Sequence, residues 1–81
     1  MKLSIQLFAG AKAAAAGSSV QLSLSPGATV AELRRKLVEA APGLTPLMDT
    51  LLVAVNNQYA TAEQTLHPED EVACFPPVSG G

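Results

Sequence analysis

Residues 2–8 and residues 19–24 each alternate between apolar and polar side chains. A period of two predicts two half-buried strands, and their spacing lets them pair antiparallel. Between them, four consecutive alanines favour a short helical turn, and Gly17 is expected to end it. Phe8 falls on the polar parity of the first strand, so we expect it on the face that points away from the core.

A helical period begins after the turn at Pro26-Gly27. Apolar residues recur three and four positions apart and predict the main helix over residues 30–41. Thr29 has the position of an N-cap that accepts from the Glu32 amide, and Pro42-Gly43 ends the helix. The basic run Arg34-Arg35-Lys36 lies mostly off the apolar stripe. It is either an exposed face or a docking patch for an acidic partner.

The second half of the chain predicts three more strands. Residues 51–55 form a continuous apolar run typical of a central strand, residues 59–61 suit a brief edge strand, and residues 71–75 form the last strand. Residues 44–50 are ambiguous and allow one more helical turn. The order of elements favours an α+β fold, with one main helix on one face of a mixed sheet of about five strands. The strand residues expected in the core are Leu3, Ile5, Leu7, Val20, Leu22, Leu24, Val53, Val55, Val72 and Cys74.

Composition narrows the class of protein. With 81 residues the chain forms one small domain, and 48% hydrophobic against 15% charged residues argues against disorder. A net charge of −2 with five basic residues predicts no nucleic-acid partner. No apolar stretch is long enough to span a membrane, and the alternating start does not resemble a signal peptide. We therefore expect a cytoplasmic protein.

Catalytic side chains are scarce. His67 is the only histidine and precedes a proline in a predicted surface turn, next to the acidic residues 69–71. Cys74 has the inward parity of the last strand, so we expect a buried, inert thiol; a single cysteine also excludes an internal disulfide and a cysteine-based zinc site. We expect no bound cofactor, no metal and no enzyme activity in this chain alone.

The end of the sequence is its most unusual feature. Pro76-Pro77 ends the last strand, and Val78, Ser79 and Gly80 lead to Gly81. Residues 77–81 reach roughly 16 Å when extended, and the side-chain-free glycines suit a narrow tunnel. The Gly81 carboxylate becomes reactive once ATP converts it to an acyl-adenylate, from which sulfur or an amine displaces AMP. An inert polar tail is the alternative.

The run from Asp70 to Gly81 resembles the C-terminus of the small, sulfur-carrying subunit of molybdopterin synthase. Leu7-Phe8-Ala9 and Val55-Asn56 resemble that family in matching order. The resemblance implies the ubiquitin-like β-grasp fold, with a domain over residues 1–76 and a flexible tail over residues 77–81. The family often has glycine where this chain has Glu69. Because Pro68 supports a type I turn without positive φ, we expect little effect.

The resemblance also implies a function in molybdenum cofactor biosynthesis. An E1-like adenylyltransferase would use ATP to adenylate Gly81, and a sulfur donor protein would convert it to a thiocarboxylate. The tail (Pro77, Val78, Ser79 and Gly80) would then enter the active site of the large synthase subunit. There Gly81 would give sulfur to cyclic pyranopterin monophosphate. Catalytic groups would belong to the large subunit, and the complex would be a heterotetramer.

The parity of the aromatic residues predicts a partner surface. Phe8 and Phe75 both lie opposite the core parity of their strands, and pairing of the first and last strands would bring them together beside the tail. Tyr59 joins them by position. Packing at strand ends is the alternative, because a slip of one residue reverses the faces.

Three other functions are also compatible with the sequence. Sulfur carriers for the thiazole of thiamine share the fold and the two terminal glycines. A ubiquitin-like modifier would join Gly81 to lysines, and it differs only in the nucleophile that meets the adenylate. The last alternative is an interaction module with an inert tail.

Overall fold

The computed structural model describes residues 1–77. Its elements, in chain order, are β1 (Lys2–Leu7), α1 (Gly10–Ala15), β2 (Ser19–Ser23), α2 (Val30–Ala40), the 3₁₀ helix η1 (Pro42–Leu47), β3 (Leu52–Val55), β4 (Gln58–Tyr59) and β5 (Val72–Phe75). The predicted strands and the main helix are confirmed to within one or two residues. The ambiguous segment 44–50 is largely helical, because η1 occupies its first half.

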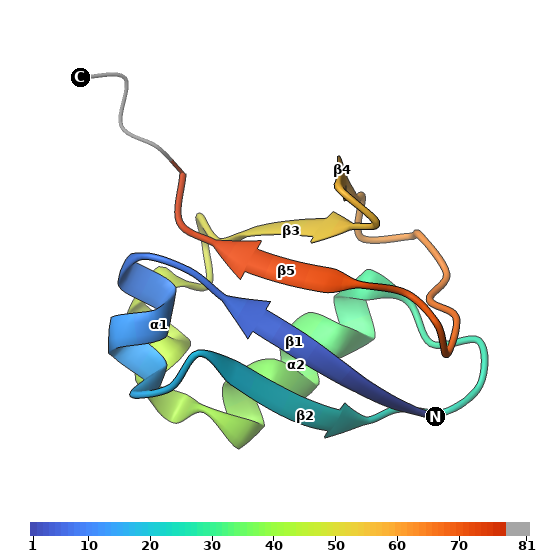
Figure 1. The fold of residues 1–81 in the computed structure, drawn as a ribbon, viewed down its shortest axis with the longest axis horizontal. Coiled ribbons are helices and arrows are strands. Elements are labelled where there is room, and N and C mark those ends of the chain that lie inside the picture. Colours follow the sequence, from blue (N-terminus) through green and yellow to red (C-terminus); the bar gives the residue numbers. More distant parts are fainter. Residues whose placement is uncertain (78–81) are drawn as a thin grey trace.

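The strands form one mixed sheet in the order β2-β1-β5-β3-β4 (Figure 1). β1 pairs antiparallel with β2 and parallel with β5, and β5 pairs antiparallel with β3. The first and last strands therefore lie side by side, with Leu7 opposite Cys74. This register carries Phe8 to the end of β5 where the chain leaves the sheet.

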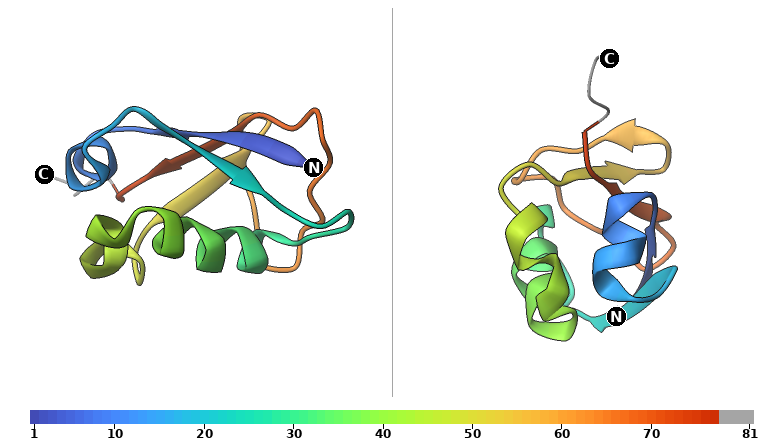
Figure 2. Two further views of the ribbon diagram at one scale, coloured as in Figure 1. Left: turned by 90° about the horizontal axis from the view of Figure 1, so that it is seen from below. Right: turned by 90° about the vertical axis from the view of Figure 1, so that its left-hand side faces the viewer.

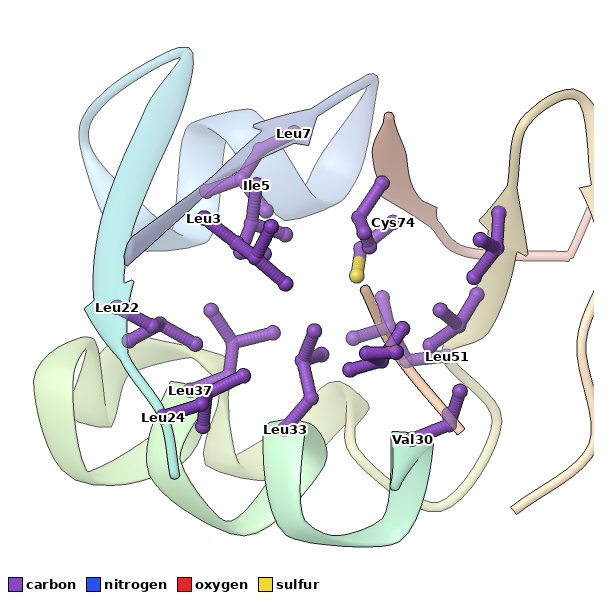
Figure 3. Close-up of a cluster of buried hydrophobic side chains, with 14 of the residues drawn as sticks. Leu3, Ile5, Leu7, Leu22, Leu24, Val30, Leu33, Leu37, Leu51 and Cys74 are labelled. Atoms are coloured by element: carbon purple, nitrogen blue, oxygen red, sulfur yellow. The ribbon is translucent and has the colours of Figure 1, made fainter. Parts of the chain in front are cut away.

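The core lies between the sheet and α2, which covers one face and leaves the other open (Figure 2). Leu33 and Leu37 of α2 are fully buried against the inward side chains of the strands (Figure 3). Each such leucine stabilises the fold by about 1.5–3 kcal/mol. The inward parity is confirmed, and Val20 of the edge strand β2 packs against the core while remaining half-buried.

The first helix ends one residue earlier than its glycine suggested. Ala16, not Gly17, takes the left-handed conformation, with φ 57°. The Gly17 amide donates to the Lys12 carbonyl and the Ala16 amide to the Ala13 carbonyl, which is a Schellman motif. The expected helical turn is confirmed, but an alanine carries the strain of its end.

The main helix begins as its sequence predicted. The Thr29 hydroxyl accepts from the Glu32 amide at 3.4 Å. The amides of Val30 and Ala31 lie in the first turn and have no partner within the helix. They donate to the carbonyls of Gln64 and Ala62, respectively. The loop before Leu66 therefore satisfies the helix start with backbone oxygens, and Leu66 itself is buried in the core.

Candidate functional site

The three aromatic residues meet on the open face of the sheet. The rings of Tyr59 and Phe75 lie 6.0 Å apart at 47°. The Phe8 amide donates to the Cys74 carbonyl, so Phe8 sits beside Phe75 at the end of the paired strands. Phe8 is 53% exposed and Tyr59 74%, although neither is charged. The predicted gathering of these residues, here called the aromatic patch, is confirmed.

Tyr59 is positioned by a tight hairpin. Asn56 and Asn57 connect β3 to β4, with φ of 52° and 68°. Two consecutive positive φ values define a type I′ turn, whose twist matches that of paired strands. Asparagine tolerates this conformation, so the turn forms without glycine. The hairpin places Tyr59 opposite Ala54 and turns its ring toward Phe75.

A shallow hollow of about 530 Å³ opens between the aromatic rings. Its lining residues are Phe8, Ala9, Ala54, Asn57, Tyr59, Ala73, Phe75 and Pro76. None of these described residues is charged. An uncovered apolar hollow with aromatic walls is typical of the core of a protein–protein interface.

The chain leaves the sheet at the edge of this hollow. β5 ends at Phe75, as the diproline predicted, and Pro76 is half-buried. Pro76 approaches the start of α1 so closely that a Cβ on Gly10 would lie 3.6 Å from its ring. Pro77 is exposed. The other predicted tail residues, Val78, Ser79, Gly80 and Gly81, lie outside the described residues.

Cys74 lies beneath the exit of the chain but faces the core. Its side chain is fully buried, and burial raises the pKa of the thiol to about 12. The nearby Arg34 charge opposes this increase only in part. The thiol is therefore protonated at neutral pH and is no nucleophile, as the parity of the strand predicted.

His67 and Asp70 form a surface turn. The Asp70 carboxylate accepts from the His67 amide at 2.8 Å and from the Asn56 side chain at 3.0 Å, and these bonds lower its pKa. The Asn56 side chain in turn accepts from the Glu71 amide. Glu69 is not among the residues with positive φ, as expected. The turn thus anchors the start of β5 to the β3–β4 hairpin.

Arg34 has a role that the sequence did not reveal. Its guanidinium donates to the carbonyls of Leu51, at 2.7 Å, and Met48. Arg35 and Lys36 are exposed. The basic run is therefore not one docking patch, because its first member ties α2 to the segment before β3. The sequence carried no signal for this, because the partners are backbone atoms 14 and 17 residues away.

Two further findings concern the described part of the chain. Within residues 1–77, no three His, Cys, Asp or Glu side chains gather in a way that would hold a metal ion. No helix in the same range combines the length and the apolar character that crossing a bilayer requires.

Known proteins resemble this chain in both sequence and fold. The profile of the ThiS family matches residues 5–81. The chain is 31% identical to the molybdopterin synthase sulfur carrier subunit of Chlamydomonas reinhardtii, covering 100% of both chains, and 35% identical to that of Dictyostelium discoideum, covering 95% and 93%. SAMP1 of Haloferax volcanii, a small archaeal modifier protein, matches with 30% identity and a TM-score of 0.89 over 100% of both chains.

These matches cover the chain from the first strand to the glycine pair, and they confirm the ubiquitin-like β-grasp fold that the order of elements and the resemblance predicted. The chain belongs to the ThiS family and is a homologue of the molybdopterin synthase sulfur carrier subunits.

Proposed function

We propose that this protein is the sulfur carrier subunit of a molybdopterin synthase and that the Gly81 carboxylate carries the sulfur. In the first step the carboxylate attacks the α-phosphorus of ATP and releases pyrophosphate, which leaves an acyl-adenylate. A donor that delivers sulfur at the sulfide level then displaces AMP and leaves a thiocarboxylate. The thiocarboxylate sulfur bonds to cyclic pyranopterin monophosphate as a thioester, and water cleaves the bond between Gly81 and the sulfur, which returns the carboxylate.

One observation carries the proposal: the aromatic patch borders the point where the chain leaves the sheet toward Gly80-Gly81. A carrier must hand its terminus to other proteins, and an apolar surface at the base of the tail gives them a place to bind. The body supports the same reading, since its one thiol is buried and protonated. Homology to sulfur carrier subunits agrees with it.

Three partners follow from this chemistry. An E1-like adenylyltransferase supplies ATP and the adenylation site, and a sulfur donor protein supplies the sulfur. The large synthase subunit binds the aromatic patch, receives residues 77–81 in its active site and provides the catalytic groups. The carrier itself needs no bound cofactor, and we place it in the cytoplasm.

A second function is favoured by a specific similarity. The match to SAMP1, at a TM-score of 0.89, is to a modifier protein. The same adenylate, met by a lysine amine instead of sulfur, would give an isopeptide bond. The alternative therefore requires no change in this chain, only a different nucleophile.

Intact mass spectrometry tests the proposal. Protein purified from its own cells should contain a species heavier by about 16 Da, because one sulfur replaces one oxygen. Incubation with purified large subunit and cyclic pyranopterin monophosphate should return it to the carboxylate mass. Deleting Gly81 should remove the heavier species and leave the fold intact, since no core residue is touched. Lysine conjugates without a thiocarboxylate would instead favour the modifier.

A matched pair of variants tests the docking surface. Phe75→Asp should weaken binding to the large subunit by about 2 kcal/mol or more, because it puts a charge at the centre of an apolar contact. Gln21→Asp adds the same charge to an exposed residue on the edge strand β2, which β1 separates from β5, and should bind normally. Loss of the folded circular dichroism spectrum in Phe75→Asp would instead assign that ring to the fold.

A further inference from the structure

The strand register orders the open face of the sheet into rows. In one row Gln6, Ala73, Ala54 and Tyr59 lie side by side across β1, β5, β3 and β4. The next row toward the tail contains Phe75 opposite Leu52 on β3, and Phe8 follows the end of β1, two residues after Gln6. The rings of Phe8 and Phe75 in this second row therefore lie beside the two alanine side chains of the first.

Ala54 and Ala73 therefore form the floor of the hollow. They are paired across β3 and β5, and both are partly exposed. Phe8 and Phe75 rise on the side of the tail, and Tyr59 rises at the end of the row. A depression with a floor of two methyl groups and aromatic walls has the shape that receives one projecting apolar side chain.

An acidic residue borders the opposite side of this floor. Glu71 precedes Ala73 by two positions on the same face, a distance of roughly 7 Å along a strand. It is exposed and lines the adjoining hollow together with Gln6, Phe8, Ala54 and Asn57. Among the described residues that line either hollow, Glu71 is the one with a charge. The apolar floor thus has a negative rim on one side.

The length of the tail limits which molecule covers this surface. Residues 77–81 reach at most roughly 16 Å from the edge of the hollow. A protein that encloses Gly81 must approach the body within that distance, and the aromatic patch is the apolar surface at the exit. The occupant is therefore a protein that receives the terminus, and under the proposed function that protein is the large synthase subunit, which encloses residues 77–81.

We propose that the large synthase subunit inserts one apolar side chain onto the Ala54–Ala73 floor and places a lysine or arginine opposite Glu71. This rests on the proposed function and adds two determinants of partner choice to it. The alanines set the size of the inserted side chain, because any larger residue would fill the space. Glu71 selects a basic partner surface by charge complementarity.

Added bulk on the floor tests the first determinant. Ala54→Leu should lower affinity for the purified large subunit at least 10-fold, measured by isothermal titration calorimetry. Ala73→Val is a second, smaller change and should lower it less. Ala31→Leu adds the same bulk to an exposed position on α2, on the opposite side of the sheet, and should stay within twofold of the unmodified protein. Circular dichroism verifies that each variant is folded.

Charge removal tests the second determinant. Glu71→Gln should weaken binding about 3- to 10-fold at low salt, and the difference should shrink as salt screens the pair. Glu63→Gln removes the same charge from an exposed residue of the loop before Leu66 and should bind as the unmodified protein does. Equal effects of Glu71→Gln and Glu63→Gln would show that binding depends on net charge alone, and would overturn the proposed role of Glu71.

The outcomes separate the inference from the function on which it rests. If folded Ala54→Leu binds normally while Phe75→Asp does not, the floor is not a receptor for a side chain, and the carrier function stands. If no variant of the patch alters binding but Gly81 still becomes a thiocarboxylate, the partner docks elsewhere. If the thiocarboxylate never forms, the carrier function itself fails.

Discussion

Arg34 and Arg35 are neighbours of the same type on one helix, yet the structure assigns them different roles. The Arg34 guanidinium donates to the carbonyls of Leu51 and Met48, and so fastens α2 to the chain that enters β3. Arg35 is exposed and makes no side-chain hydrogen bond or ion pair with residues 1–77. Replacing each by methionine keeps most of the stem and removes only the charged donors.

The expected cost follows from these contacts. A hydrogen bond from a charged group contributes about 1.5–3 kcal/mol, so the two bonds of Arg34 set an upper range of about 3–6 kcal/mol. The released side chain recovers part of about 2 kcal/mol of rotamer entropy, and water replaces some of the lost donors. We therefore expect Arg34→Met to lower the free energy of unfolding by about 2–3 kcal/mol. Arg35→Met should change it by less than about 0.5 kcal/mol.

Urea denaturation followed by far-ultraviolet circular dichroism measures this difference without a tryptophan. For a domain of this size, 2–3 kcal/mol corresponds to a drop in Tm on the order of 10–20 °C. Thermal scans of both variants therefore give an independent reading. Equal destabilisation by the two substitutions, or none by either, would show that the bonds from Arg34 do not hold the helix to the chain before β3.

Three other features of the structure can be tested in solution. Gly43→Ala should lower the free energy of unfolding by about 2 kcal/mol or more. The added Cβ would overlap the Ala14 carbonyl oxygen, and a urea titration measures the loss. Asp70 has a lowered pKa, chiefly because its carboxylate accepts a hydrogen bond from the His67 amide. Its contribution to the free energy of unfolding is therefore present above the usual pKa of about 3.9 and is lost as the pH falls through the lower pKa of the folded state. The stability difference between unmodified protein and Asp70→Ala should therefore be constant near neutral pH and shrink below about pH 4. The Cys74 thiol, with a pKa of about 12, should resist a disulfide reagent at pH 8 in the folded state and react once urea unfolds the protein; rapid reaction without urea would contradict its burial.

Local patterns predicted most of the fold because each element carries its own period. The alternation of β1, β2 and β5 determined which side chains face the core, and Val20 of β2 follows it with only partial burial. The same parity predicted that Phe8 and Phe75 would share the open face. Their meeting required one further assumption, the pairing of first and last strands, which the register confirms.

Contacts between a side chain and a distant backbone had no such signal. Arg34 was grouped with two exposed cations because nothing in a helical period marks which of three adjacent basic residues meets a carbonyl from another segment. The left-handed end of α1 at Ala16 had no signal either, because glycine is the usual residue at that position and Gly17 follows directly. The alanine floor of the hollow was also missed, because small residues stand out only when the register places them together.

β5 connects the fold to the proposed function. Its inward residues, Val72 and Cys74, are fully buried, while Ala73 and Phe75 on the other parity line the hollow, and the strand then leads directly to the tail. One strand therefore stabilises the body with one face and lines the proposed docking surface with the other. Because the two sets alternate, substitutions on the outward face can alter docking without opening a cavity in the core. Stability and binding should accordingly separate by parity. Val72→Ala should lower the free energy of unfolding by about 1–3 kcal/mol and leave the affinity of the folded protein for the large subunit unchanged. The outward variants Ala73→Val and Phe75→Asp should instead lower that affinity and change the free energy of unfolding less.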